Sequence, residues 1–268
     1  MNRFLKQKII IAIYITIFLV IAGLITMAMQ PKPRCDDGKK NGEEIEIDCG
    51  GPVCGACKEE LVGKDIVVKE AQVLYGGENT YDVVAEIHNP NGFFGGEKVH
   101  YTVEIYDSGK NVLAKRDNVT FILPNENKYI VEIGLDSMQQ ASGANVTIDK
   151  VDWVKFTNFD SPQIFVRNQR FGLVQNTTDY AEAFGLVSNE GPYDFHDVTI
   201  NVILLDERGV PIAANKTVQK TLDADSKREF RLTWPHKFPG TIASAEMQAE
   251  ANVFDSLNYM TKYIPVTE

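Results

Sequence analysis

The chain has 268 residues, of which 44% are hydrophobic and 24% are charged. These fractions are those of a globular protein, so they exclude a wholly disordered chain, and the length allows about two ordinary domains. The formal net charge is -10, and beyond Arg3, Lys6 and Lys8 there are 24 basic against 37 acidic residues, or -13. An acidic surface repels phosphates, so we exclude a nucleic-acid partner.

Residues 9–29, IIIAIYITIFLVIAGLITMAM, contain no charged side chain. At about 1.5 Å of rise per residue, a helix of this length covers about 30 Å, which is the hydrocarbon thickness of a bilayer. The run is longer than the apolar core of a signal peptide, and no small-x-small site follows it. It therefore predicts a transmembrane helix that serves as an uncleaved signal anchor in the lipid bilayer, with a cleaved signal peptide as the alternative.

The orientation of this helix does not follow from charge alone, since basic residues flank it on both sides. Clustered cysteines are typical of an oxidising compartment. A large acidic region after a short basic N-terminus is what a signal anchor exports. We therefore place residues 1–8 in the cytoplasm and the chain from about residue 30 outside it.

Residues 30–61 predict a cysteine-rich stalk that contains every cysteine of the chain. Its apolar residues are too few to form a core, so disulfides must stabilise it. Two bridges among Cys35, Cys49, Cys54 and Cys57 would each contribute about 2–4 kcal/mol. Four cysteines allow three connectivities, and the sequence does not choose among them.

The stretch CDDGKKNGEEIEIDCGGPVCGAC is similar to the C-x-D-G-x-x-N-G-x-E-x-x-x-D-C-G-G-x-C-x-x-C element of exported prokaryotic proteins, with one extra residue at Pro52 or Val53. The resemblance implies a disulfide-bonded spacer. Three other interpretations stay open: a redox pair at Cys54 and Cys57, a structural zinc held by the four cysteines, and a calcium site. The oxygen ligands for calcium would come from Asp36, Asp37, Asn41, Glu43, Glu44 and Asp48.

From about residue 65 to the end, the chain alternates apolar and polar residues, is rich in Val, Ile, Tyr and Thr, and breaks at Gly, Asn and Pro. This pattern predicts half-buried antiparallel strands. Within it lies an internal repeat: a shift of 99 residues places Val103 on Val202, Asp107 on Asp206 and Leu135 on Trp234. We therefore expect a mainly β protein with two tandem sandwiches, residues 62–158 and 160–268.

The first copy resembles the FxLYD and late-embryogenesis-abundant-like families of immunoglobulin-like β-sandwiches. The matching features are the turn Asn89-Pro90-Asn91, Tyr106-Asp107 with Gly109, and Pro124. The second copy departs from them, with Ser188-Asn189-Glu190 at the first turn and Asp223 in place of Pro124. The resemblance implies a binding or scaffolding module.

Four aromatic residues near glycines are the candidate binding residues: Phe93 and Phe94 in the first copy, Tyr193 and Phe195 in the second. They could equally be packed loop tips. The four histidines (His88, His100, His196 and His236) are scattered, and Trp153 and Trp234 fit core positions. Asn118, Asn145, Asn176 and Asn215 begin N-x-Thr sequons, which matter only in a host that glycosylates exported chains.

The sequence contains no phosphate-binding glycine loop, no H-E-x-x-H and no G-x-S-x-G. We therefore expect a non-catalytic protein without a cofactor, which displays two sandwiches from the membrane and binds a protein partner in the envelope or at the surface. The alternatives are a thiol-disulfide redox protein that uses Cys54 and Cys57, and a purely structural spacer.

Overall fold

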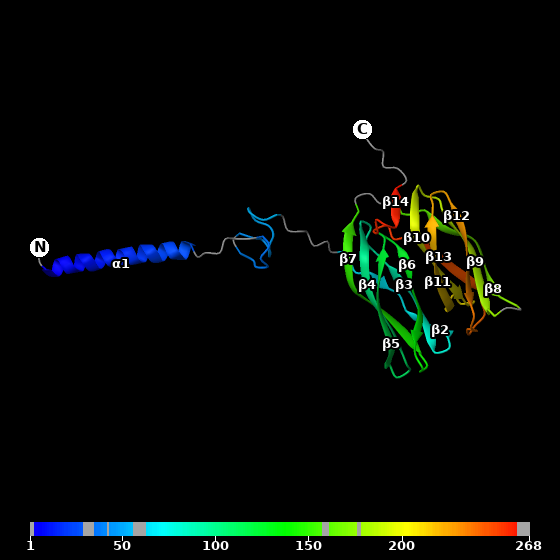
Figure 1. Cartoon of the computed structure of the whole chain (residues 1–268). Coiled ribbons are helices and arrows are strands. Elements are labelled where there is room, and N and C mark those ends of the chain that lie inside the picture. The colour runs from blue at the N-terminus through cyan, green and yellow to red at the C-terminus, as the bar shows by residue number, and fades with distance from the viewer. Residues whose placement is uncertain are drawn as a thin grey trace, which may run out of the picture. The chain divides into compact units, whose positions relative to one another are not determined.

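The computed structural model describes residues 3–28, 35–41, 43–55, 63–156, 161–175 and 178–261. The chain divides into two compact units, Met1–Glu60 and Leu61–Glu268. The first contains a helix and the cysteine-rich segment, and the second contains all the named strands (Figure 1). The protein is mainly β with antiparallel sheets, as the alternating sequence pattern predicts.

Helix α1 (Arg3–Ala28) includes almost the whole uncharged run. No proline interrupts it, and its first turns carry the basic residues Arg3, Lys6 and Lys8. Its apolar side chains from Ile11 to Ile25, where described, are largely exposed within the unit. Among the described residues, no helix is both long enough and apolar enough to cross a membrane.

The first repeat consists of two sheets. Sheet I has β3 (Thr80–His88) at its centre, with β6 (Asn127–Asp136) on one edge and β1 (Val67–Val68) and β2 (Gln72–Gly77) along the other. Sheet II has β4 (Phe94–Tyr106) between β5 (Val112–Ile122) and β7 (Gly143–Lys155). Alternate residues of both sheets, such as Ile87 and Val103, fill the core between them.

The second repeat has the same plan. Sheet III places β9 (Ala181–Asn189) between β8 (Ile164–Leu173) and β12 (Lys227–Trp234). Sheet IV places β10 (Tyr193–Leu205) between β11 (Pro211–Leu222) and two shorter strands, β13 (Ser244–Glu250) and β14 (Tyr259–Thr261). Both ends of β4 and β10 differ by 99 residues, which is the spacing of the sequence repeat.

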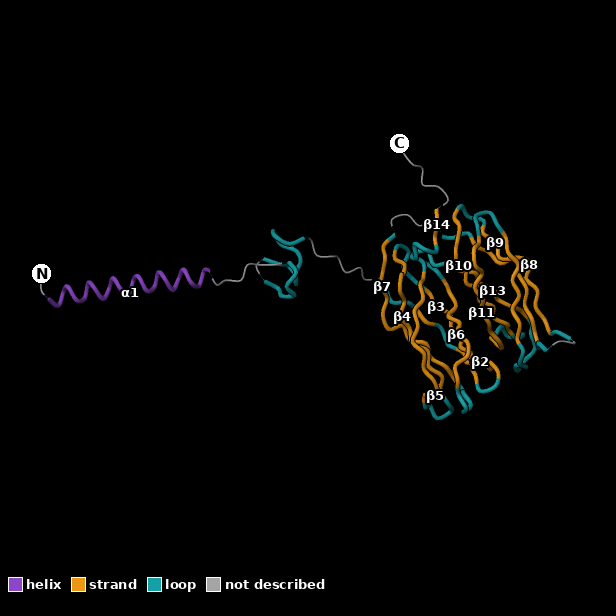
Figure 2. Tube along the Cα trace, in the orientation of Figure 1, coloured by secondary structure: helices purple, strands orange, loops and turns teal. Residues whose placement is uncertain are grey.

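The two sandwiches are not separate bodies, because a third apolar cluster joins them. Leu74, Val84 and Val131 on the outer face of sheet I pack against sheet IV, whose contribution is Ile203, Leu205 and Ala214. The sheets thus form four layers in the order II, I, IV, III (Figure 2). The expected boundary near residues 158–160 falls within one compact unit and outside the described residues.

Equivalent hairpins use the same aspartate in both repeats. The Asp107 carboxylate accepts the backbone N–H of Asn111, and the Asp206 carboxylate accepts that of Val210, each at 2.9 Å. For Asp107 the bonds from Asn111, and for Asp206 chiefly that from Val210, hold the pKa below its ordinary value. The chain turns at residues 107–110, and the repeat extends to the side-chain chemistry of its hairpins.

A buried asparagine at the end of the central strand of sheets I and III, directly after β3 and as the last residue of β9, holds the next loop in place. Asn89 Nδ2 donates to the carbonyls of Phe94 and Leu123, at 2.7 and 2.8 Å. Asn189 Nδ2 donates to those of Tyr193 and Leu222, at 2.6 and 3.2 Å. The two asparagines are 100 residues apart, so the ungapped shift of 99 pairs Asn189 with Pro90 and conceals the match.

We expect Asn189→Ala to lower the free energy of unfolding by about 1–3 kcal/mol, because it leaves buried carbonyls without a donor. Urea denaturation of the full chain, followed by tryptophan fluorescence, measures this loss. Asn127→Ala, at an exposed asparagine of β6, is the control and should change it by less than about 0.5 kcal/mol. Equal losses in the two variants would contradict the anchoring role.

Candidate functional site

A cleft of about 730 Å³ lies between the two repeats. Strands β4, β5 and β6 supply one side, and β10, β11, β13 and residues 252–256 supply the other. Its lining combines rings, amides and charges: Tyr101, Phe121, Tyr129, Phe254; Asn118, Asn201, Asn252; Glu97, Lys98, Lys216, Glu250 and Asp255. Because both repeats build it, the cleft depends on their fixed packing.

One wall of the cleft is formed by a loop of the second repeat, residues 251–258, which we call the excursion. Thr199 pairs with Glu250 at the end of β13, and Phe195 pairs with Tyr259 at the start of β14, so residues 251–258 oppose only residues 196–198. In the first repeat β7 continues without such a break. Buried Asn258 closes the excursion, since its Oδ1 accepts the Asp197 N–H and its Nδ2 donates to the Asn252 carbonyl.

The excursion reaches the first repeat through an aromatic side chain. The Phe254 ring packs edge-on against Phe121, with centroids 6.3 Å apart, and lies 5.6 Å from that of Phe156. Gly95 allows this approach, because a Cβ there would stand 2.8 Å from the Phe254 ring. The excursion is therefore packed against both repeats.

The buried carboxylate Glu132 lies behind the cleft on β6. Its oxygens accept hydrogen bonds from Tyr101 Oη at 2.6 Å, Asn118 Nδ2 at 2.9 Å and Arg116 Nη1 at 3.3 Å, and Lys216 Nζ stands 4.0 Å away. Burial by itself would raise the pKa of Glu132, but these donors and cations outweigh it and lower that pKa. The carboxylate therefore stays charged and holds β4, β5 and β11 around one point.

A second buried charge joins the repeats directly. Lys128 Nζ on β6 lies 2.7 Å from Glu250 Oε2 on β13, and the two side chains are only 1% and 11% exposed. The ammonium also lies 3.5 Å from the centre of the Phe121 ring, and Asn201 Nδ2 donates to Glu250 Oε1 at 3.3 Å. Each charge offsets the burial of the other.

We expect Lys128→Met to lower the free energy of unfolding by about 3–5 kcal/mol, because it leaves the buried Glu250 carboxylate without its cation. Adding Glu250→Leu to the same chain should restore most of that loss, since an apolar pair of similar volume needs no charge compensation. Urea denaturation measures both variants. A double variant as unstable as the single one would show that the ion pair is not the cause.

Asp82 lies on β3 at the register shift between β3 and β6, beside Glu132. It is 5% exposed, its Oδ1 accepts the Gly134 N–H at 2.8 Å, and Arg116 donates to the carbonyls of Ile133 and Gly134. Burial raises the pKa of Asp82 to about 6, and the Gly134 hydrogen bond and the Arg116 charge only partly oppose it. The folded protein therefore holds this proton more tightly than the unfolded chain, whose value is 3.8.

A raised carboxyl pKa stabilises the fold at low pH, and this stabilisation is lost as the pH rises from about 4 to about 6. Asp82→Asn keeps an acceptor for Gly134 and removes the titration. Relative to the wild type it should therefore gain about 2–3 kcal/mol of unfolding free energy between pH 4 and pH 7. Denaturation series at several pH values test this, and parallel pH curves for the two proteins would contradict it.

The aromatic residues predicted as binding tips do not form one site. Phe93 is 67% exposed, but Phe94 begins β4 and pairs with Lys155. Tyr193 begins β10 and packs on the core, and Phe195 is a core residue that is 2% exposed. The prediction is wrong for Phe195 because the strand begins before it and turns alternate side chains inward. Phe94, Tyr193 and Phe195 belong to strands, and of the four only Phe93 lies in the loop before β4.

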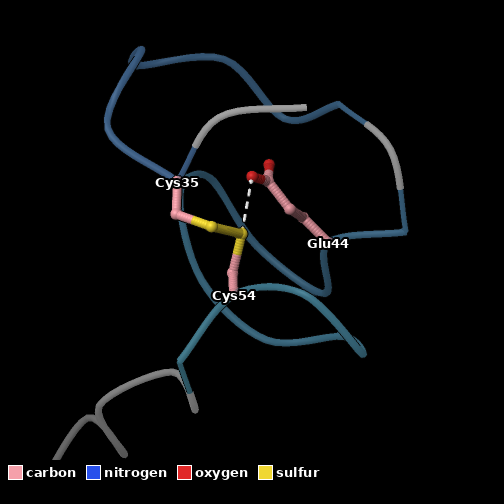
Figure 3. Close-up of side chains that lie close together, drawn as sticks. All are labelled: Cys35, Glu44 and Cys54. Carbon is pink, nitrogen blue, oxygen red and sulfur yellow. Dashed lines mark hydrogen bonds between the residues drawn. A yellow bond between two sulfur atoms is a disulfide. The ribbon is translucent and has the colours of Figure 1, made fainter. Parts of the chain in front are cut away.

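The disulfide Cys35–Cys54 settles part of the connectivity that the sequence leaves open (Figure 3). Cys49 is also disulfide-bonded, and Cys57 lies outside the described residues. The predicted redox pair of Cys54 and Cys57 is wrong, because the Cys54 sulfur is bonded to Cys35. The zinc hypothesis fails for the same reason, since bridged sulfurs are not thiolate ligands.

The acidic side chains of this segment bind its own backbone. Asp48 accepts the N–H groups of Asp37 and Gly38, and Glu44 accepts that of Asn41 at 3.0 Å. Glu44 Oε1 also lies 3.3 Å from the Cys54 sulfur, a contact without a proton because that sulfur is bridged (Figure 3). The carboxylates of Asp36, Asp37, Glu43, Glu44 and Asp48 do not gather into a cluster among the described residues, so calcium gains no support.

Sequence reasoning missed the cleft and its buried charges. Lys128, Glu132 and Glu250 look like exposed residues of polar strand faces, and only packing between distant strands buries them. One signal was readable: residues 83–85 and 202–205 are consecutive apolar residues, which indicates strands covered on both faces. The histidines, in contrast, remain scattered, and the lining of the described cleft contains neither histidine nor cysteine.

No protein-family model matches the chain, and no curated protein matches it. Among solved structures, the crystal structure of red sea bream transglutaminase aligns over 72% of this chain with 12% identity and a TM-score of 0.21. The chain spans 29% of the length of that protein. A likeness this low carries no argument about fold or activity.

Proposed function

We propose that this chain is a non-catalytic, single-pass membrane protein that displays a rigid pair of β-sandwiches outside the cytoplasm. In this proposal the cleft between the repeats binds a segment of a partner protein. The observation that carries it is the cleft itself, which both repeats build and which the apolar cluster of sheets I and IV holds open. Its mixture of rings, amides and charges suits polypeptide.

The anchor in this proposal is α1. Its support is the uncharged run of residues 9–29, apolar on all sides of the helix, together with the exposure of its described side chains. No helix among the described residues is both long and apolar enough to span a membrane. The proposed anchor therefore rests on the sequence of residues 9–29. Export of the rest of the chain is supported by the Cys35–Cys54 disulfide, since such bonds persist in oxidising compartments.

An extended segment fits this cleft better than a globular surface. Among the described strands β5 pairs only with β4, so its other edge is unpaired, and residues 118–121 of β5 line the cleft. Edge strands commonly bind extended peptides by adding them to the sheet. Tyr129 and Phe254 would then face side chains of the bound segment.

Two finer assignments belong to the same proposal. The sandwiches are related to the FxLYD and late-embryogenesis-abundant-like domains, and residues 35–57 are the disulfide spacer of exported prokaryotic proteins. The hairpin aspartates support the first, and the bridge and backbone-capping carboxylates support the second. A purely structural spacer is the second candidate, because a rigid stack of sheets also serves to hold distance.

A photo-crosslinking residue tests binding in the cleft. Val119 on β5 and Val218 on β11 are equivalent positions of the repeat and are 47% and 45% exposed, but only Val119 lines the cleft. In intact cells of the source organism, the residue at position 119 should capture a partner protein, and the residue at position 218 should not. The captured chain should remain with the membrane pellet after alkaline extraction.

Ser256→Trp, at an exposed residue of the cleft wall, provides the matched block and should abolish the adduct at position 119. Adducts at both positions, or an adduct that survives Ser256→Trp, would contradict binding in the cleft. Absence of adducts at both would favour the spacer. Release of the protein into the alkaline supernatant would contradict the anchor alone.

A further inference from the structure

We infer that Asn145 is an acceptor for an N-linked oligosaccharide, and that the matching sequons at Asn118 and Asn215 are not. The inference rests on the proposed export of the second unit. Each of the three is followed two residues later by threonine. The structure gives their side chains different surroundings, and this difference separates one acceptor from two structural asparagines.

Asn145 lies on β7, the outer strand of sheet II, opposite Glu104 of β4. Because side chains alternate along a strand, Asn145 and Thr147 share one face, and both are exposed while Val146 between them is buried. Asn145 Nδ2 donates to Thr147 Oγ1 at 3.1 Å. The acceptor amide therefore contacts the hydroxyl of its own sequon on a solvent-facing surface.

Asn118 is exposed like Asn145, but both ends of its amide are hydrogen-bonded to other residues of the fold. Its Nδ2 donates to Glu132 Oε1 at 2.9 Å, and its Oδ1 accepts the N–H of Val119 at 2.8 Å. A sugar on this nitrogen would crowd its hydrogen bond to Glu132, a carboxylate that Arg116 and Tyr101 also contact. Attachment here would disturb the buried carboxylate.

Asn215 repeats this arrangement in the second sandwich. Its Nδ2 donates to the Thr233 carbonyl at 3.0 Å, and its Oδ1 accepts the N–H of Lys216 at 2.8 Å. The side chain thus connects β11 of sheet IV with β12 of sheet III. Asn118 and Asn215 occupy different positions on the equivalent strands β5 and β11, and each connects the two sheets of its own sandwich.

The modification transfers a sugar from a polyprenyl-phosphate-linked or polyprenyl-pyrophosphate-linked oligosaccharide. The bond between the anomeric carbon and the phosphate oxygen breaks, and a bond from that carbon to Asn145 Nδ2 forms. The lipid phosphate leaves, and the amide nitrogen gives one proton to the transferase. The exposed face of β7 and the Thr147 hydroxyl are both compatible with an oligosaccharide attached to Asn145 Nδ2.

The full chain should be made in a host that attaches N-linked oligosaccharides to exported proteins, and its peptides analysed by mass spectrometry. We expect glycan on the peptide of Asn145, at more than about tenfold the occupancy of the peptides of Asn118 and Asn215. Asn145→Gln and Thr147→Val should each remove it. Asn118→Gln should leave it in place and lower the stability of the fold.

Two results would overturn the inference: an unmodified Asn145 in protein proved to be outside the cytoplasm, and glycan at Asn118 or Asn215 at equal occupancy. Export is checked in the same sample by protease accessibility of the second unit in intact cells and by the Cys35–Cys54 disulfide. Failure of those checks would contradict the proposed export. It would leave the choice of Asn145 over Asn118 and Asn215 to be judged in a sample that is exported.

Discussion

The second unit depends on the apolar contact between the outer faces of sheets I and IV. Each of these sheets covers its own sandwich core with one face and so has a second face to bury. Apolar side chains on both faces satisfy that requirement, at about 25 cal/mol for each Å² removed from water. Because this contact fixes the two repeats, the Lys128–Glu250 pair can be buried at its margin, and the cleft keeps one shape.

The strands, the hairpin aspartates and the repeat could be predicted from the sequence, because each depends on a pattern that is visible in the residues themselves. Alternation gives the strands their inward face, and a shift of 99 residues brings Asp107 onto Asp206. The joining of the two repeats was not predicted. It requires knowing which outer faces meet, and the apolar runs at residues 83–85 and 202–205 mark those strands without naming their partners.

The candidate site was the least predictable part, for a physical reason. A cleft between repeats takes its residues from strands more than one hundred positions apart, such as those of Tyr129 and Glu250. No local motif records such a contact. The aromatic tips were local features, and strand alternation placed Phe195 in the core instead. The cysteines were predictable in part. Their number predicts disulfide bridges, but only the structure identifies the Cys35–Cys54 pair.

The joint between the sheets is heterologous, because it brings together two different faces of one repeating unit. Such joints do not close, and successive copies would extend into an open filament. The free ends of this stack prevent that. Where sheet I has the apolar pair Val84 and Val131, sheet III has Phe184 and Arg231; where sheet IV has Ile203 and Ala214, sheet II has Glu104 and Lys115. Charged side chains on these outer faces oppose a further joint of the same kind.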